Sequence, residues 1–176
     1  MPQNTPSVAP CQKNLLIAFF DLSKYAVSCR NKPSREIFDF LNQYYHWVDE
    51  SVHQAEGRVI KFIGDGGLAV FSEEHSEKGI MALMALKRKV DGWLKGDWSA
   101  CSMNVKCHFG EAILGEIGGT HTARTDVMGE NVNICARLGT GGVVLSPQAF
   151  RRLSPPNRKF FKKFTPPIVY HPVHAK

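Results

Sequence analysis

Residues 57–71 read GRVIKFIGDGGLAVF, two apolar runs that meet at a Gly-Asp-Gly-Gly turn. Two runs of this length around an Asp-Gly pair predict a β-hairpin. On either side of it, residues 34–55 and 77–94 place apolar side chains every three to four positions, which predicts two amphipathic helices. The hairpin is therefore expected to lie between two helices.

Two further strands complete this pattern. Residues 15–22 (LLIAFFDL) form a continuous apolar run, as in a buried strand, and residues 103–109 alternate between apolar and polar, as in a half-buried strand. The order strand, helix, strand, strand, helix, strand predicts an α+β fold, a ferredoxin-like (βαββαβ) sandwich. Extra C-terminal strands and helices are expected: a short helix over residues 131–138, strands over 142–145 and 168–170, and a helical turn from Pro147.

Length and composition fit one globular domain. The chain has 176 residues, 43% of them hydrophobic, and a formal net charge of +6. A chain of this size buries a core without disulfides or a structural metal. Residues 1–13 contain three prolines and no periodicity, so we expect a flexible leader there and one domain over residues 14–176.

Composition disfavours several classes of protein. No apolar run approaches the roughly 18 residues of a membrane span, and the N-terminus lacks the pattern of a signal peptide. The five cysteines are scattered without a CxxC pair, which argues against a disulfide framework or a zinc site and favours thiols in a reducing compartment. We therefore expect a cytoplasmic protein.

Asp21 and Asp65 are the first candidates for chemistry. Each follows an expected strand, and in a βαβ arrangement the two strand ends can be neighbours, which brings the carboxylates together. Paired carboxylates with substrate phosphates suit Mg²⁺ or Mn²⁺, and two such ions about 4 Å apart can hold a phosphoryl group during in-line displacement. Taken singly, Asp65 could equally serve the turn, and Asp21 could cap the next segment.

Four blocks of the sequence resemble the catalytic domain of the class III nucleotidyl cyclases, the family of adenylate and guanylate cyclases. They are IAFFDLSKYA (17–26), GRVIKFIGDGGLAVF (57–71), HFGEAILGEIG (108–118) and TDVMGENVNICARL (125–138), and they follow the family order. The resemblance covers about residues 14–172. It implies the class III cyclase version of the sandwich predicted above.

The resemblance implies a metal and triphosphate site. Asp21 and Asp65 match the two metal-binding aspartates, which would hold two Mg²⁺ or Mn²⁺ ions per active site. Leu22 would add its backbone carbonyl as a metal ligand. The triphosphate would meet the N–H groups of the turn that follows, formed by Ser23, Lys24 and Tyr25.

The resemblance also implies two catalytic residues. Asn133 and Arg137, four positions apart and so on one helix face, match the residues that stabilise the transition state. A guanidinium keeps its charge and donates in a planar fork, which suits the α-phosphoryl oxygens. Lys162 lies where the family places a phosphate-binding lysine, with Lys163 as the alternative alignment.

Lys61 and Asp126 match the pair that reads the purine base. Lysine only donates hydrogen bonds, and an ionised aspartate only accepts them. Adenine offers an acceptor at N1 and a donor at its 6-amino group, whereas guanine reverses both polarities. A mismatch in such a site is worth up to about 10⁴ in discrimination, so the pair predicts ATP rather than GTP as the substrate.

The implied activity is that of an adenylate cyclase, in which the 3′-hydroxyl of ATP attacks its own α-phosphorus and yields 3′,5′-cyclic AMP and pyrophosphate. In this family one chain supplies the metal aspartates of an active site, and the other supplies the base-reading and transition-state residues. The resemblance therefore implies a homodimer with two shared active sites, and residues 118–125 resemble the dimerisation arm.

Two features depart from the family. Lys24 stands where a glycine is usual, and the segment after Arg137 is several residues shorter. Glycine lets the backbone approach the phosphates closely. These departures leave open a second function, that of a catalytically weak or silent cyclase-like module that binds nucleotide or a partner.

A third possibility rests on a basic and aromatic stretch near the C-terminus, which could contact phosphates and stack on bases. The stretch comprises Arg151, Arg152, Arg158, Lys159, Lys162 and Lys163 with Phe160, Phe161 and Phe164. The simpler interpretation is a solvated strand whose phenylalanines face the core. We therefore expect no nucleic-acid partner.

Overall fold

The computed structural model describes residues 9–139 and 141–173. In chain order its elements are β1 (Cys11–Ser23), α1 (Tyr25–Ser28), α2 (Ser34–Gln54), β2 (Gly57–Ile63), β3 (Gly66–Ser72), α3 (Ser76–Trp93), the 3₁₀ turn η1 (Gly96–Trp98), β4 (Ser102–Ile117), β5 (Arg124–Met128), α4 (Glu130–Ala136), β6 (Val143–Leu145), α5 (Pro147–Phe150), α6 (Pro155–Arg158), β7 (Phe161–Phe164) and β8 (Val169–Pro172).

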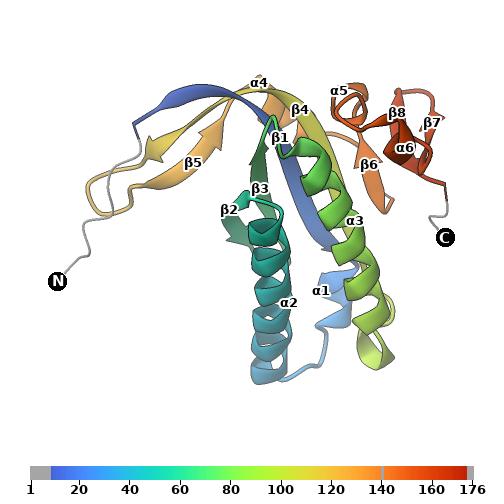
Figure 1. Cartoon of the computed structure of the whole chain (residues 1–176). Coiled ribbons are helices and arrows are strands. Elements are labelled where there is room, and N and C mark those ends of the chain that lie inside the picture. Colours follow the sequence, from blue (N-terminus) through green and yellow to red (C-terminus); the bar gives the residue numbers. More distant parts are fainter. Residues whose placement is uncertain (1–8, 140, 174–176) are drawn as a thin grey trace.

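One eight-stranded sheet holds these elements together (Figure 1). The strands run in the order β2-β3-β1-β4-β6-β8-β7, and β5 pairs with β4 beside this path. β1 lies between β3 and β4 and is antiparallel to both. The order β1, α2, β2, β3, α3, β4 and the antiparallel pairing confirm the predicted βαββαβ sandwich with additional C-terminal elements.

Both faces of the sheet are covered. The helices α2 and α3 pack on one face, where alternate residues of β1 join the main core (Figure 1). The intervening residues Leu15 and Ile17 face the other side and pack with Cys135 of α4. β1 is therefore apolar along both faces, as its continuous apolar run predicts.

β4 differs from the half-buried strand that its alternation predicts. Asn104 and His108, which belong to the polar phase, are 8% and 2% exposed. His108 Nε2 lies 2.8 Å from Asn131 Oδ1 of α4, and Lys106 donates to the carbonyl of Ala136 at the end of that helix (3.1 Å). α4 thus covers this face at Lys106 and His108, whereas Asn104 finds its partners elsewhere, and these polar side chains bond to protein groups.

The two ends of the chain also differ from expectation. Residues 1–8 of the predicted leader lie outside the described residues, and residues 11–13 belong to β1 because they pair with residues 112–114 of β4. In the basic stretch only Phe161 is buried, whereas Phe160 and Phe164 are exposed, so the phenylalanines do not all face the core. None of the described helices is long and apolar enough to cross a membrane.

Candidate active site

The Gly-Asp-Gly-Gly turn brings Asp65 to the end of β1. Its carboxylate accepts a hydrogen bond from the backbone N–H of Leu22 (3.2 Å). Gly66 allows this approach, because a Cβ at that position would lie 2.7 Å from the carbonyl oxygen of Phe20 and 3.4 Å from Cβ of Asp21. The structure therefore places the two predicted metal ligands, Asp21 and Asp65, side by side.

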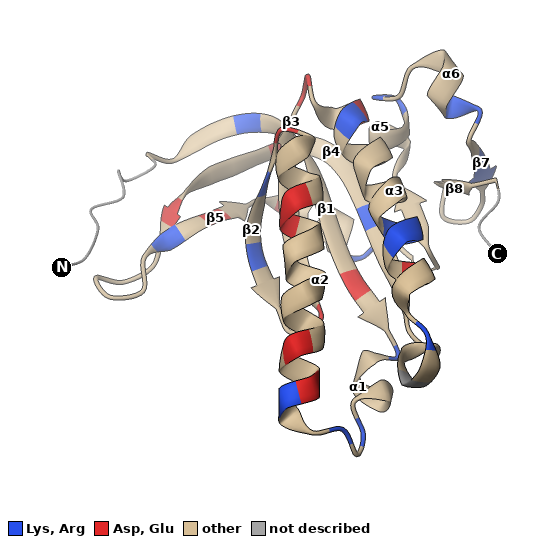
Figure 2. Ribbon diagram, turned by 60° about the horizontal axis from the view of Figure 1, so that its bottom comes forward, with Lys and Arg blue, Asp and Glu red and all other residues tan. Residues whose placement is uncertain are grey.

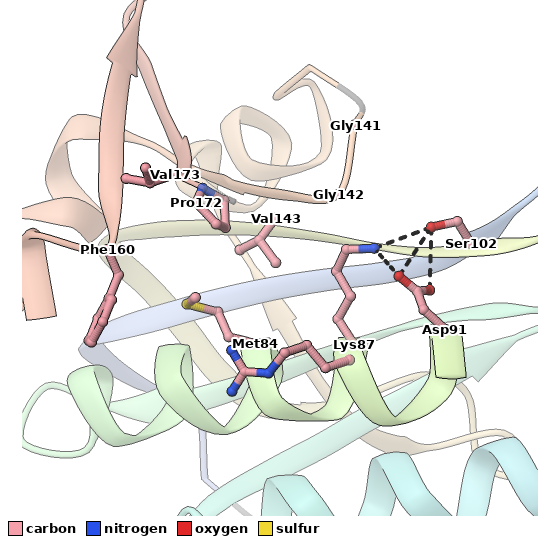
Figure 3. A pocket seen from close by; sticks show the side chains of 11 residues that line it. Met84, Lys87, Asp91, Ser102, Gly141, Gly142, Val143, Phe160, Pro172 and Val173 are labelled. Atoms are coloured by element: carbon pink, nitrogen blue, oxygen red, sulfur yellow. Dashed lines mark hydrogen bonds and ion pairs between the residues drawn. The ribbon is translucent and has the colours of Figure 1, made fainter. Parts of the chain in front are cut away.

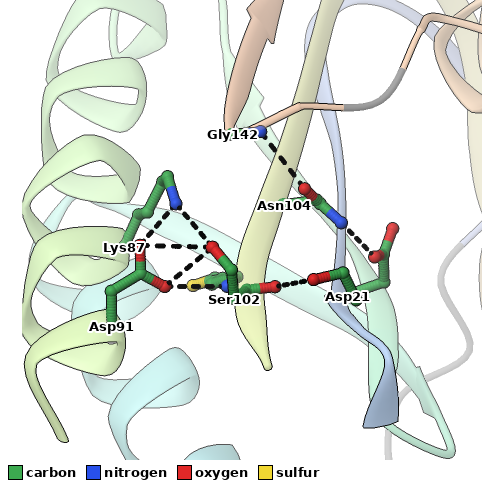
Figure 4. A network of polar contacts seen from close by, with 8 residues as sticks. Asp21, Lys87, Asp91, Ser102, Asn104 and Gly142 are labelled. Atoms are coloured by element: carbon green, nitrogen blue, oxygen red, sulfur yellow. Dashed lines mark hydrogen bonds and ion pairs between the residues drawn. The ribbon is translucent and has the colours of Figure 1, made fainter. Parts of the chain in front are cut away.

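Asp21 is held from the neighbouring strand. Asn104 donates from Nδ2 to Asp21 Oδ1 (2.8 Å), and its Oδ1 accepts from the backbone N–H of Gly142 (3.2 Å), as Figure 4 shows. In the sequence, Asn104 stands out only as one of the polar residues of an alternating strand. The signal that could have revealed its role is the cross-strand pairing of Asn104 with Asp21, which depends on the register of two distant segments.

Tyr44 of α2 lies in the core near both carboxylates. Its hydroxyl is buried and has no hydrogen-bond partner among the described residues. Burial raises the pKa of Tyr44 most, and the negative charges of Asp21 and Asp65 raise it further. The neighbouring Tyr45 donates to the carbonyl of Gly64, which fixes the turn that carries Asp65.

The donor set at Asp21 and Asp65 fits a divalent cation that also binds substrate. No Lys or Arg among the described residues forms an ion pair with either carboxylate, and no group of three or more His, Cys, Asp or Glu side chains suited to a metal occurs there. Two carboxylates leave most coordination positions of Mg²⁺ or Mn²⁺ to water and phosphate oxygens, as is usual for nucleotide-bound ions.

Lys61 and Asp126 form a second polar cluster. The ammonium of Lys61 lies 2.6 Å and 2.9 Å from the two carboxylate oxygens of Asp126, which is 2% exposed. The register of β2 against β3 shifts between Val59 and Lys61, and such a bulge changes the direction of the side chains that follow. The adjoining β5 supplies Asp126 opposite Gly115 of β4.

The charge of Asp126 is compensated within the chain. Burial raises its pKa, but hydrogen bonds from Lys61 and from the backbone N–H of Val127, with the charges of Lys61 and Arg124, outweigh burial and hold the pKa below its ordinary value. Arg124 lies 3.7 Å from the carboxylate. The cluster is therefore an ionised pair in which a donor and an acceptor lie side by side.

Asn133 and Arg137 lie on and just after α4, and both are exposed. A pocket of about 200 Å³ is lined by Asp21, Lys106 and Ala136, so the end of this helix lies beside Asp21. No hydrogen bond or ion pair of the described residues joins the side chain of Asn133 or Arg137 to Asp21 or Asp65. Within one chain the two residues predicted to be catalytic therefore make no direct polar contact with the carboxylates.

The remaining predicted residues occupy two separate places. Lys24 caps α1 with φ 58°, the left-handed conformation that glycine adopts most easily, and Ser23 donates to the carbonyl of Ser102 (3.1 Å). Lys162 lies on β7, at the opposite edge of the sheet from β2, with its ammonium 5.3 Å from the ring centre of Phe164. One chain therefore does not bring Lys162 to the other candidates.

Comparison with known proteins identifies the family. Residues 8–162 match the family described as adenylate and guanylate cyclase catalytic domain. Among curated proteins, an adenylate cyclase of Anabaena cylindrica is 24% identical over 144 residues, and an uncharacterised protein of Mycobacterium tuberculosis is 26% identical over 137 residues. These alignments cover 77% and 76% of this chain but 29% and 24% of the relatives, so the chain spans less than a third of their length.

Solved structures share the fold at low sequence identity. A bacterial light-regulated adenylyl cyclase superposes with a TM-score of 0.82 at 18% identity, over 96% of this chain and 53% of that one. The adenylyl cyclase CyaB from P. aeruginosa gives 0.81 at 15% identity, over 96% and 98%. The guanylyl cyclase Cya2 gives 0.69 at 19% identity, over 93% and 92%. The chain belongs to the adenylate and guanylate cyclase catalytic domain family.

Proposed function

We propose that this domain is an adenylate cyclase that converts ATP to 3′,5′-cyclic AMP and pyrophosphate. The observation that carries the proposal is the ion pair of Lys61 and Asp126, which places the N–H donors of a partly exposed lysine beside the carboxylate acceptors of a buried aspartate. Lys61 would donate to adenine N1, and Asp126 would accept from the 6-amino group. Guanine would place its N1–H donor against the Lys61 donor and its O6 acceptor against the Asp126 acceptor. ATP is therefore the substrate that fits.

Asp21 and Asp65, with the backbone carbonyl of Leu22, would hold two Mg²⁺ or Mn²⁺ ions. When bound, these ions would lower the pKa of the attacking 3′-hydroxyl and neutralise the triphosphate. The hydrogen bond from Asn104 to Asp21 and that from the Leu22 N–H to Asp65 orient the two carboxylates before any ligand arrives.

Phosphate and ribose would be held by groups outside this pair. Arg137, exposed at the end of α4, would stabilise charge on the α-phosphoryl oxygens, and Asn133 would orient the ribose. Lys162, or Lys163 beside it, would contact phosphate. Backbone N–H groups where β1 ends and α1 begins, those of Ser23, Lys24 and Tyr25, would face the triphosphate.

A homodimer would combine the separated parts. The β4–β5 hairpin extends from the body of the sheet (Figure 1), and three large apolar side chains on it are exposed: Ile113 and Ile117 by 48% each and Met128 by 44%. Ile113 and Met128 are directly paired across the two strands. Exposed apolar groups gathered on one hairpin support a contact with a second copy. We also place the domain in the cytoplasm, which the five unpaired cysteines support.

The activity is tested with purified protein, ATP or GTP, and Mn²⁺ or Mg²⁺, with the cyclic nucleotide measured by chromatography. We expect cyclic AMP from ATP, with a kcat/KM for ATP above that for GTP by up to about 10⁴. Equal use of the two nucleotides would contradict the assigned role of Lys61 and Asp126. If a dimer is present and neither cyclic AMP nor cyclic GMP is formed, the result would favour the silent module.

Mixing two inactive variants tests the shared site. Asp21→Ala removes a metal ligand, and Arg137→Ala removes the transition-state cation, so each homodimer is expected to be inactive. A mixture forms heterodimers with one intact site, and its activity should recover to about a quarter of wild type if chains mix at random. Heterodimers that form without regaining activity would refute the shared site.

The weak or silent module remains the second candidate, and one observation favours it. Lys24 has a left-handed backbone (φ 58°) and is exposed, so its ammonium lies at the turn expected to meet the triphosphate. An ammonium there either assists phosphate binding or obstructs it, and removing it by Lys24→Ala separates the two effects.

A further inference from the structure

A second cavity lies on the side of α3, away from the residues assigned to catalysis. Its volume is about 470 Å³, within the range of small-molecule sites. Figure 3 shows Met84 on α3 facing Val143, Pro172 and Val173 across it, with Phe160 at one end. One long wall of the cavity is therefore apolar.

The other wall carries positive charge. Lys87 is paired with Asp91 and also donates to Ser102 Oγ (3.2 Å), as drawn in Figure 3. Arg88 also lines the cavity, and no carboxylate among the described residues forms an ion pair with it. Two cations and one carboxylate give a net charge of +1, on a helix that Figure 2 shows to carry several basic residues. An apolar wall opposite one uncompensated positive charge fits an amphipathic monoanion.

The cavity is linked to the metal cluster through hydrogen bonds. Gly142 forms part of its wall and donates to Asn104, which in turn donates to Asp21 (Figure 4). Ser102, also in the wall, accepts from Ser23 through its carbonyl. Gly142 is therefore joined to Asp21 by two hydrogen bonds that pass through Asn104.

We propose that this cavity binds a small amphipathic monoanion, an aromatic or aliphatic carboxylate or sulfonate, and that occupancy strengthens metal binding at Asp21. The second half rests on the proposed function, since it takes Asp21 as a metal ligand. With its anionic group at Lys87 and Arg88, a ligand whose apolar body packs against Gly142 would restrain that residue with its N–H toward Asn104, and Asn104 would hold the carboxylate of Asp21. This makes the cavity a regulatory site distinct from the nucleotide site.

Binding is tested without metal or nucleotide, by fluorescence titration with 1-anilinonaphthalene-8-sulfonate. N-phenyl-1-naphthylamine has the same apolar body without the sulfonate and serves as the matched probe. We expect saturable one-to-one binding of the sulfonate, weakened about tenfold by Arg88→Glu, with little change for the uncharged probe. The matched control is Lys89→Glu, which makes the same charge change at the next residue of α3. Lys89 does not line the cavity, so this variant should bind both probes with unchanged affinity.

Three outcomes overturn the binding site. They are no saturable sulfonate binding, equal binding by wild type and the folded Arg88→Glu variant, and equal affinity for the charged and uncharged probes. Circular dichroism of each variant checks that it is folded. If Arg88→Glu does not fold, Arg88→Gln removes the charge with a smaller change in shape, and the same comparison applies.

Coupling is tested by Mn²⁺ titration with and without saturating sulfonate. Mn²⁺ affinity should rise about fivefold with the probe bound, and Asn104→Ser, which shortens the bridge, should abolish the rise while leaving the probe's affinity intact. Unchanged Mn²⁺ affinity at saturating probe overturns the coupling. If Mn²⁺ does not bind at all, the metal assignment itself fails, whereas the binding test above still stands on its own.

Discussion

The two polar clusters of the candidate site differ in how their charge is balanced. Asp126 is buried but receives hydrogen bonds from the ammonium of Lys61, with Arg124 nearby. Asp21 and Asp65 receive hydrogen bonds from uncharged donors, Asn104 and a backbone N–H, and have no ion-pair partner among the described residues. The negative charge of Asp126 is thus balanced within the chain, whereas the negative charges of Asp21 and Asp65 are not balanced by a described Lys or Arg.

This difference indicates what each cluster requires from a ligand. Like charges that share a site repel each other, and either a proton or a cation must compensate them. The metal cluster is therefore expected to gain most from Mg²⁺ or Mn²⁺. The Lys61–Asp126 pair is formed without a ligand, so in the proposed function its contribution would be selectivity rather than charge compensation.

The largest expected effect comes from reversing the base-reading cluster. Lys61→Glu with Asp126→Asn places an acceptor where adenine N1 would bind and a donor where its amino group would bind, which matches guanine. We expect the ratio of kcat/KM for ATP to that for GTP to fall by about 10³ or more. The measurement is initial rates with each nucleotide, and a ratio unchanged in a folded double variant would contradict the base-reading role.

A smaller effect is expected from removing one partner of the ion pair. Lys61→Met leaves the buried Asp126 carboxylate without its ammonium, which should cost about 2 kcal/mol of unfolding free energy at pH 7. Urea unfolding provides the measurement. The matched control is Lys61→Met with Asp126→Asn, which removes the charge left behind and should recover most of the loss.

The same variant makes a prediction about pH. The pKa of Asp126 is lowered in the folded chain, so the pair stabilises above the unfolded carboxylate pKa of about 3.9 and loses this contribution as the pH falls below it. The stability difference between wild type and Lys61→Met should therefore shrink below about pH 3.9. A difference that stays constant across that range would show that it does not arise from the charge of Asp126.

The smallest effect concerns the turn beside the metal cluster. Lys24→Gly relieves the left-handed backbone at φ 58° and should raise the unfolding free energy by about 0.5 kcal/mol after the entropy of glycine in the unfolded chain is counted. Lys24→Ala removes the same charge but keeps a Cβ, so it should bring no gain. A KM for ATP that rises equally in both variants would show that the ammonium assists phosphate binding, and a KM that falls in both would show that it obstructs.

The architecture could be predicted from the sequence because it depends on local periodicity. The two helices, the hairpin at residues 57–71 and the buried first strand follow from spacing alone, and the nearness of Asp21 to Asp65 follows from where two strands end. The packing of α4 on β4 could not be predicted in this way. Alternation of apolar and polar residues shows that one face of a strand is polar, but not whether water or a polar helix surface covers that face.

The parts of the site that sequence missed all depend on register between distant segments. Asn104 reaches Asp21 only because β1 and β4 pair at those positions, and the bulge before Lys61 has no signature in the local sequence. The Tyr44 hydroxyl, which has no hydrogen-bond partner among the described residues, is buried by the packing of α2 over β1. All three features arise from tertiary contacts, which cannot be predicted from the propensities and spacing of residues in the sequence.

The most direct test of the central claim is a Mn²⁺ titration followed by electron paramagnetic resonance, with 3′-deoxy-ATP present so that no cyclisation occurs. Wild type should bind Mn²⁺ saturably, and Asp65→Asn should weaken that binding by about tenfold or more, since one of two anionic ligands is lost. Asp39→Asn, at an exposed carboxylate paired with Arg35, should leave it unchanged. Equal Mn²⁺ affinity in wild type and a folded Asp65→Asn variant would contradict the claim that Asp21 and Asp65 form the metal site.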